Sequence, residues 1–234
     1  MTPNEAPTDV EAWNDRLATE HDIDAYYADA NPLIRAIERR RLRIIRQMIG
    51  SAKGSRVLEV GCGGDVLQLF PEAERVGVDP SGAMLEKAAR KLADESVVLI
   101  QGELRTAELP SASFDVVICT EVLEHVVDPA EVIADIREVV KPGGLVVITI
   151  PNDGLIEALK KVVRLSGLGF LPGLRRHAWG GDEFHLHAWN LGQMRTLLDS
   201  QFKIRHEAFA PGRPLPVRCC FACEPREPGS ASSA

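Results

Sequence analysis

Between residues 56 and 150, short apolar runs typical of β-strands alternate with stretches typical of helices. The runs lack the polar–apolar alternation of a half-exposed sheet, which indicates parallel strands covered by helices on both faces. Repetition of strand, helix and strand over about 100 residues predicts a doubly wound α/β fold. The expected strands are residues 56–60, 75–78, 96–100, 115–119 and 144–150, and the expected helices between them are residues 66–70, 82–92 and 129–140.

The flanking segments complete the predicted fold. A helix over residues 191–200 and β-like runs over 202–209 and 217–224 extend the sheet to seven mostly parallel strands. The expected division is an N-terminal arm and helices over 1–50 that form a cap (with one helix over 32–49), an α/β core over 51–153, an insertion or lid over 154–189, the last core elements over 190–225, and a disordered tail over 226–234.

Composition excludes several classes of protein. The 27 Lys and Arg against 34 Asp and Glu give a net charge of −7, and only 5% of residues are aromatic, so nucleic acid is not an expected partner. The longest apolar run, Leu145 to Ile150, is far too short to span a bilayer. Five cysteines, two of them adjacent, make a poor disulfide framework, and the first residues lack a secretory pattern. We therefore expect a cytoplasmic protein.

A glycine-rich turn follows the first expected strand, in the segment VLEVGCGGD over residues 57–65. Glycines let the backbone turn tightly and approach a ligand, and ligands of open α/β sheets bind beyond the carboxyl ends of the strands. The dinucleotide pattern GxGxxG fails, because Val66 stands where its last glycine would be. Glu59 and Asp65 would repel a pyrophosphate but tolerate a cationic ligand. Asp79, at the end of the next strand, can accept hydrogen bonds from both hydroxyls of a ribose.

In these features and their order the sequence resembles the class I S-adenosylmethionine-dependent methyltransferases, in particular the small-molecule group that includes ubiquinone and menaquinone methylases. The resemblance covers about residues 55–151 and 183–209. Its motifs are VLEVGCGGD (57–65), VGVDPSGAML (76–85), QGEL (101–104), SFDVV (113–117), TEVLEHV (120–126), KPGG (141–144) and HLH (185–187). One departure is Asp65, which stands where the family usually has a third glycine. As a good helix N-cap, Asp65 would still let a helix start.

The resemblance implies a Rossmann-like sheet whose last strand is antiparallel, and S-adenosylmethionine as the cofactor. It places the methionine end at Glu59, Gly61 and Gly63, the ribose at Asp79, and the adenine at Glu103 and Leu104. The implied cofactor-binding residues also include Cys62, Pro80, Met84, Gly102, Thr120 and Glu121. The implied function is methyl transfer to an oxygen or nitrogen of a small molecule, such as a natural product, quinone, sugar or lipid-like compound. The alternative is a protein that binds the cofactor without turning it over.

Histidines are the natural candidates for a base near neutral pH, and His125 and His187 are the predicted catalytic residues. His125 follows the fourth expected strand, at the edge where ligands bind. His185 and His187 would share one face of a strand, but no third ligand has clear spacing, so no metal centre is predicted. Cys219, Cys220 and Cys223 resemble half of a zinc site and are interpreted as residues of the last strand.

Residues 154–177 combine apolar residues at helical spacing with Lys160, Lys161, Arg164, Arg175 and Arg176. Such a basic amphipathic stretch is typical either of a packed helix with solvated charges or of transient contact with a lipid surface. It keeps an acidic or lipid-like substrate open as a hypothesis.

Overall fold

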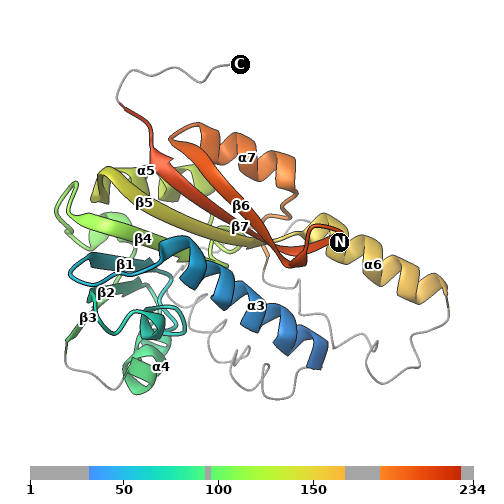
Figure 1. The fold of residues 1–234 in the computed structure, drawn as a ribbon, viewed down its shortest axis with the longest axis horizontal. Helices are drawn as coiled ribbons and strands as arrows, with labels where there is room; N and C mark the ends of the chain where they lie inside the picture. Colours follow the sequence, from blue (N-terminus) through green and yellow to red (C-terminus); the bar gives the residue numbers. More distant parts are fainter. Residues whose placement is uncertain (1–31, 93–95, 167–184, 228–234) are drawn as a thin grey trace.

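The structure is a computed structural model that describes residues 32–92, 96–166 and 185–227. Residues 1–31 of the predicted arm, 167–184 of the predicted insertion and 228–234 of the predicted tail lie outside the described residues. Figure 1 shows a central sheet with helices on both faces. The strands are β1 (Arg56–Val60), β2 (Glu74–Asp79), β3 (Val97–Gln101), β4 (Phe114–Thr120), β5 (Val140–Pro151), β6 (Phe202–Gly212) and β7 (Leu215–Pro225).

The seven strands form one sheet in the order β3-β2-β1-β4-β5-β7-β6. The pairs β3–β2, β2–β1, β1–β4 and β4–β5 are parallel, and β7 runs antiparallel to both of its neighbours. The predicted fold class is therefore confirmed, including the antiparallel last strand. The order reverses direction at β1 and β4, and ligands of doubly wound sheets bind at this switch point.

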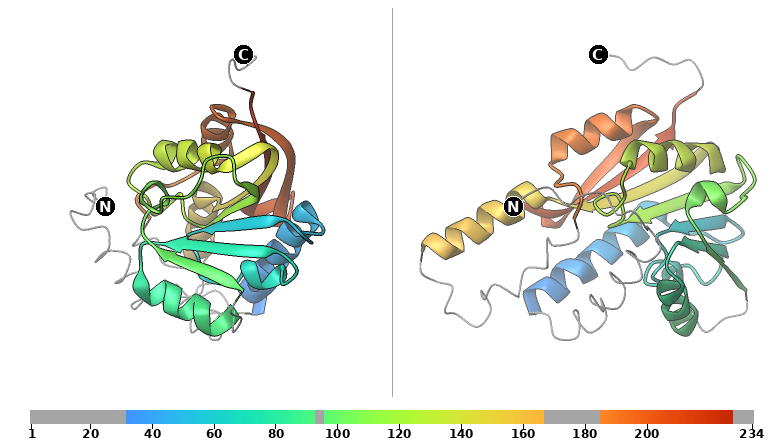
Figure 2. Two further views of the ribbon diagram at one scale, coloured as in Figure 1. Left: turned by 90° about the vertical axis from the view of Figure 1, so that its left-hand side faces the viewer. Right: turned by 180° about the vertical axis from the view of Figure 1, so that it is seen from behind.

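Two helical layers bury the sheet, as both views of Figure 2 show. Helices α5 (Pro129–Val139) and α7 (Leu191–Asp199) pack through Ile133 and Leu198 on the face that carries Leu58 and Val146. Helices α3 (Pro32–Ile49) and α4 (Gly82–Leu92) cover the opposite face, which carries Val57 and Val147. Alternate residues of one strand thus enter different cores, which explains the continuously apolar runs of the sequence. Helix α6 (Asp153–Leu165) projects from the body beyond the end of β5.

The predicted helix over residues 66–70 is wrong. The chain forms only a three-residue 3₁₀ turn, η1 (Leu67–Leu69), and Phe70 has the non-helical angles φ −127° and ψ 57°. Phe70 precedes Pro71, and the proline ring disfavours the helical region for the residue before it. The turn after β1 therefore lacks the helix that the sequence pattern predicted.

Helix α3, the described part of the predicted N-terminal cap, packs on β5, β6 and β7 as part of a sheet-covering layer. On its buried face, Glu38 and Arg41 accompany Ile37, Ile44 and Ile45. Arg41 Nε donates to Glu38 at 2.7 Å, and Arg218 Nε of β7 donates to the other carboxylate oxygen of Glu38 at 2.9 Å. Burial raises the pKa of Glu38, but the charges and hydrogen bonds of the two arginines outweigh burial and hold that pKa below its ordinary value.

Arg226 lies within the predicted tail, yet its Nε donates to the backbone oxygen of Asp199 at 3.0 Å, and this bond holds the residue in place. Among the described residues, no helix combines the length and the apolar character that a membrane crossing requires.

Replacing Glu38 with Ala tests this attachment of α3. We expect the free energy of unfolding to fall by about 3–5 kcal/mol, because Arg41 and Arg218 lose the carboxylate that compensates their charges. Urea denaturation measures the change. Glu86→Ala is the matched control, because Glu86 also lies on a helix and pairs with Arg90 at 3.7 Å, but with side chains 78% and 71% exposed. The control should change stability by less than about 1 kcal/mol. Equal losses in both variants would contradict the role of Glu38.

Candidate active site

A cavity of about 480 Å³ lies at the carboxyl ends of β1, β2 and β4, where the sheet order reverses. This volume is within the range of small-molecule sites. Its walls come from the turns that follow these strands and from η2 (Leu104–Thr106). The lining includes every predicted cofactor-binding residue except Cys62: Glu59, Gly61, Gly63, Asp79, Pro80, Met84, Gly102, Glu103, Leu104, Thr120 and Glu121.

The turn after β1 requires glycine at position 61. Gly61 has φ +72°, and a Cβ atom there would lie 2.3 Å from Cγ2 of Val122. The backbone N–H groups of Gly61 and Cys62 both donate to the oxygen of Val78, at 2.9 and 3.2 Å. The turn is thus held against β2 while it passes close to the loop after β4. The absence of a side chain leaves the backbone as the cavity wall at this point.

Glu59 is the second-last residue of β1, beneath this turn, and is only 2% exposed. One carboxylate oxygen accepts from Sγ of Cys62 and from the N–H of Leu67, both at 3.4 Å. Burial raises the pKa of Glu59 to about 7, against the weaker opposing effect of these hydrogen bonds. The carboxyl group is therefore poised to change its charge near neutral pH, and a cationic ligand in the cavity would favour its ionised form. Cys62 itself packs behind the turn and is not among the described residues that line the cavity.

Asp79 ends β2 and is 7% exposed. Its Oδ1 accepts from the N–H of Ser81 at 2.8 Å, and the hydroxyl of Ser81 accepts from the N–H of Met84 at 3.3 Å. These bonds shape the start of α4 and bring Pro80 and Met84 to the cavity wall. A carboxylate fixed in this way can offer its remaining lone pairs to a ligand with two neighbouring hydroxyls.

The sequence predicted that Asp65 caps a helix, and this prediction is wrong. The residue before η1 is Val66, and no side chain caps that turn. The carboxylate of Asp65 instead pairs with Nζ of Lys91 on α4 at 2.8 Å. The charge that stands where the family usually has glycine is thereby balanced by a cation from the same wall of the cavity.

Glu121 follows β4 with φ +55°, a rare conformation for a residue other than glycine. Its Oε1 accepts from the hydroxyl of Thr149 at 2.9 Å, and its Oε2 lies 3.0 Å from Nε of Arg218. Nη1 of Arg41 also donates to the Thr149 hydroxyl, at 3.3 Å, and Arg41 lines the cavity. Sequence reasoning missed Arg41 and Arg218. Their signal was a charged residue inside an apolar helix face and an apolar strand, where a charge requires a partner.

The two predicted catalytic histidines differ in position. His125 lines the cavity. His187 lies in a loop, not on the expected strand, and its Nε2 is 3.0 and 3.2 Å from the backbone oxygens of Val126 and Val127. Because carbonyl oxygens accept, this nitrogen carries the proton, and His187 orders the loop after β4. His187 is not among the described residues that line the cavity.

The cysteines of β7 do not form half of a zinc site. Cys219 and Cys223 are buried in the core beneath α7, whereas Cys220 is buried on the opposite face against α3. Alternation along a strand therefore separates the thiols. Burial raises the pKa of each of these three thiols to about 12, as expected of inert core cysteines.

Comparison with known proteins adds a family match over the same part of the chain. Residues 58–148 match the family model described as a methyltransferase domain. The ubiquinone biosynthesis O-methyltransferase of Alkalilimnicola ehrlichii is 36% identical over 130 residues, which are 53% of this chain and 50% of that protein. The enzyme of the same name from Shewanella halifaxensis is 35% identical over 153 residues, 61% of each chain. The chain thus spans half to three fifths of the length of these curated relatives.

A solved structure extends the likeness of fold beyond that region. The N-methyltransferase NodS of Bradyrhizobium japonicum, in complex with S-adenosylhomocysteine, superposes with a TM-score of 0.62 at 20% identity. The superposition covers 93% of this chain and 98% of that one. At this identity the likeness is one of fold.

Gly61→Ala tests the close approach of the turn to Val122. We expect a loss of stability larger than that of Gly54→Ala by about 2 kcal/mol or more, because the new Cβ meets Val122 as well as an unfavourable backbone angle. Gly54 is the matched control, because it has φ +74° and a Cβ atom there would have nothing within 4 Å. Chemical denaturation of both variants measures the difference. Equal losses would mean that only the backbone angle matters.

Proposed function

We propose that this protein transfers a methyl group from S-adenosylmethionine to an oxygen of a small molecule, since residues 58–148 match the methyltransferase domain family and the sheet has the order of a doubly wound fold. The observation that carries the proposal is the pair of buried carboxyl groups, Glu59 and Asp79, at the switch-point cavity. The turn beside them is followed by a three-residue 3₁₀ turn without a capping side chain. A pyrophosphate would find neither the amide groups of a helix start nor a favourable charge there.

The residues fit the parts of this cofactor. We assign the methionine end, with its ammonium and sulfonium charges, to Gly61, Gly63 and the carboxyl group of Glu59. We assign the ribose hydroxyls to Asp79 and the adenine to the segment from Gly102 to Leu104. When bound, S-adenosylmethionine supplies an electrophilic methyl group, so the protein needs chiefly to orient the acceptor, exclude water and remove a proton.

His125 is the proposed base of this reaction. It lines the cavity on the wall after β4, and an imidazole titrates close to neutral pH. As a carbon–oxygen bond forms to the acceptor and the carbon–sulfur bond breaks with its electron pair left on sulfur, the acceptor hydroxyl loses its proton to His125. His187 has its Nε2 committed to two backbone oxygens, so we do not assign it the same role.

Oxygen is the preferred acceptor atom in this proposal because the curated relatives are named as O-methyltransferases. Helix α6 exposes Val162 (62%) and Leu165 (77%), and this supports an apolar or lipid-like acceptor reached through transient contact with a lipid surface. The five cysteines are free and buried, which supports the cytoplasm as the compartment.

Asp79→Ala tests the cofactor assignment. We expect S-adenosylhomocysteine binding to weaken by at least about 100-fold, because the variant loses two charge-assisted hydrogen bonds to the ribose. Isothermal titration calorimetry measures the affinity, and circular dichroism checks the fold. Ser111→Ala, at an exposed serine that pairs with Glu138 away from the cavity, is the control. Unchanged affinity in the Asp79 variant would refute the assignment. Methyl incorporation from labelled cofactor into phenolic acceptors separates an enzyme from a cofactor-binding protein.

The raised pKa of Glu59 leads us to expect that cofactor binding depends on pH. Because its pKa is about 7 and the ionised form attracts the ammonium group, the affinity for S-adenosylhomocysteine should rise as the pH increases from 6 to 8. A single group of this pKa gives a change of about tenfold over that range. Glu59→Gln should bind more weakly at pH 8 and lose the slope. Glu103→Gln, which alters the adenine end, should weaken binding but keep the slope. A wild-type profile that is flat in calorimetry would exclude this role of Glu59.

A further inference from the structure

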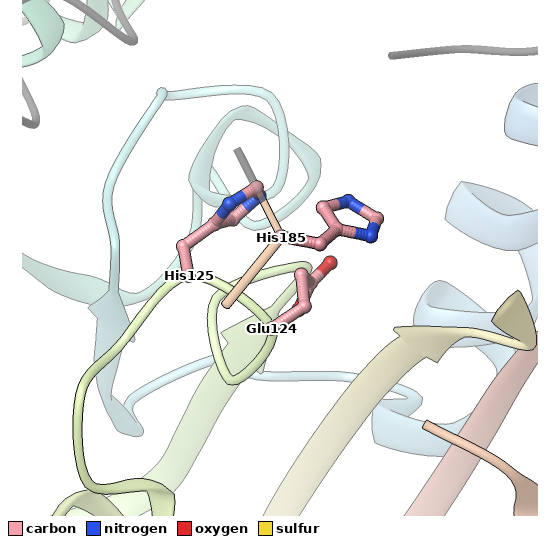
Figure 3. A group of neighbouring side chains, drawn as sticks. All are labelled: Glu124, His125 and His185. Atoms are coloured by element: carbon pink, nitrogen blue, oxygen red, sulfur yellow. The ribbon is translucent and has the colours of Figure 1, made fainter. Parts of the chain in front are cut away.

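Three side chains that could hold a metal ion meet beside the cavity. Glu124 and His125 follow β4, and His185 comes from the loop before α7 (Figure 3). One ligand atom from each lies within 4.8 Å of the other two. Ligand atoms around a zinc ion with bonds of about 2.0–2.2 Å are about 3–4 Å apart, so small side-chain rotations would close the set.

Backbone hydrogen bonds hold the two segments together. The backbone oxygen of Glu124 accepts from the N–H of Leu186 at 2.8 Å and from the N–H of His187 at 3.2 Å. The ring of His187 adds its bond to the oxygen of Val126 at 3.0 Å. The juxtaposition of His185 with Glu124 is therefore built into the chain path and does not depend on exposed side chains.

Glu124 carries the observation that points to a cation. Glu124 is 1% exposed, and its Oε2 atom is buried with no hydrogen-bond partner among the described residues. Burial, reinforced by the charge of Glu121, raises the pKa of Glu124 well above its ordinary value. An orphaned buried carboxyl oxygen is costly, and a cation would both pair with it and keep it ionised.

His185 is oriented as a metal ligand would be. Its Nδ1 lies 3.1 Å from Oδ1 of Asp153, and Asp153 is buried. The other carboxylate oxygen of Asp153, Oδ2, accepts from the backbone N–H of Trp189 at 3.1 Å. A carboxylate accepts, so the proton resides on Nδ1 and the lone pair is on Nε2. A carboxylate behind a histidine in this way is the usual support of a metal-binding imidazole.

We propose that Glu124, His125 and His185 bind one divalent transition-metal ion of the zinc type. Two imidazoles and a carboxylate suit such ions better than Mg²⁺ and leave a fourth position open. His125 lines the cavity, so the proposed site borders the cavity. The sequence predicted no metal centre because the third ligand, Glu124, is distant from His185 in the chain and close only in the fold.

The role of the ion rests on the proposed function, whereas its binding does not. In the metal-loaded protein the acceptor hydroxyl occupies the open position, and the ion lowers the pKa of that hydroxyl. The proton then leaves to water. The role of His125 as a base, proposed above, belongs to the metal-free protein, whereas in the metal-loaded protein His125 is a ligand. The oxygen, held as an anion, attacks the methyl carbon as described above.

Zinc titration of the chelator-treated full chain tests the site. We expect calorimetry to show one equivalent bound, and Glu124→Gln and His185→Gln each to weaken binding by roughly 10- to 100-fold. His206→Gln, at an exposed histidine on β6, is the matched control and should bind as the wild type does. Glu124→Gln should keep the melting temperature of the metal-free protein, because the amide has the same size and shape as the carboxyl group. Equal zinc binding by all four proteins would overturn the proposal.

Cobalt(II) provides a second readout. The absorption spectrum of the cobalt-loaded chain should lack a sulfur-to-metal charge-transfer band, because the proposed ligands are nitrogen and oxygen. A thiolate band, or Mg²⁺ competing equally with zinc, would also overturn the proposal. Titration with S-adenosylhomocysteine in the presence of chelator separates the two hypotheses. Cofactor binding without a zinc site would reject the metal alone, and zinc binding without cofactor binding would reject the proposed function alone.

Discussion

The ion pairs around Glu38 connect the parts of the molecule that the candidate site requires. Glu38 joins Arg41 of its own helix to Arg218 of β7, and Arg218 continues to Glu121 after β4. Thr149 of β5 lies between Arg41 and Glu121 and donates to the latter. Helix α3, strands β5 and β7 and the loop after β4 thus share a single network of buried and partly buried charges. Because each partner compensates another, the loop after β4 can keep a positive φ at Glu121.

The edge of the sheet that carries the cavity is rich in carboxyl groups, and each is accommodated differently. Burial raises the pKa of Glu59 to about 7, the ammonium group of Lys91 pairs with Asp65, and the guanidinium group of Arg218 pairs with Glu121. Glu124 alone among these has a buried oxygen without a partner in the described part of the chain. This distribution suits a cationic ligand at one end of the cavity and an added cation at the other. It also explains why an acidic edge can exist without unfolding the turns that form it.

The strands were predictable because their signal is local. Runs such as Arg56–Val60 are apolar on both faces, and the bounds found for β1, α3 and α4 equal those expected. The prediction of a helix after β1 was wrong. Pro71 restricts the backbone of Phe70, and the segment forms only a 3₁₀ turn. The candidate cofactor residues were predictable for a related reason. They follow strand ends, and parallel strands bring their carboxyl ends to one edge.

By itself the sequence determined the sheet, the glycine at the tight turn, and the acids at the carboxyl ends of β1 and β2, because each depends on neighbours within a few residues. Only the tertiary structure decided which charges are paired and which are not. Arg218 meets Glu38 from 180 positions away, and His185 reaches Glu124 through a loop bonded to its backbone oxygen. Such contacts depend on how distant segments pack, and so does the burial that shifts the pKa of Glu59 and Glu124. Local residue patterns carry no record of that packing.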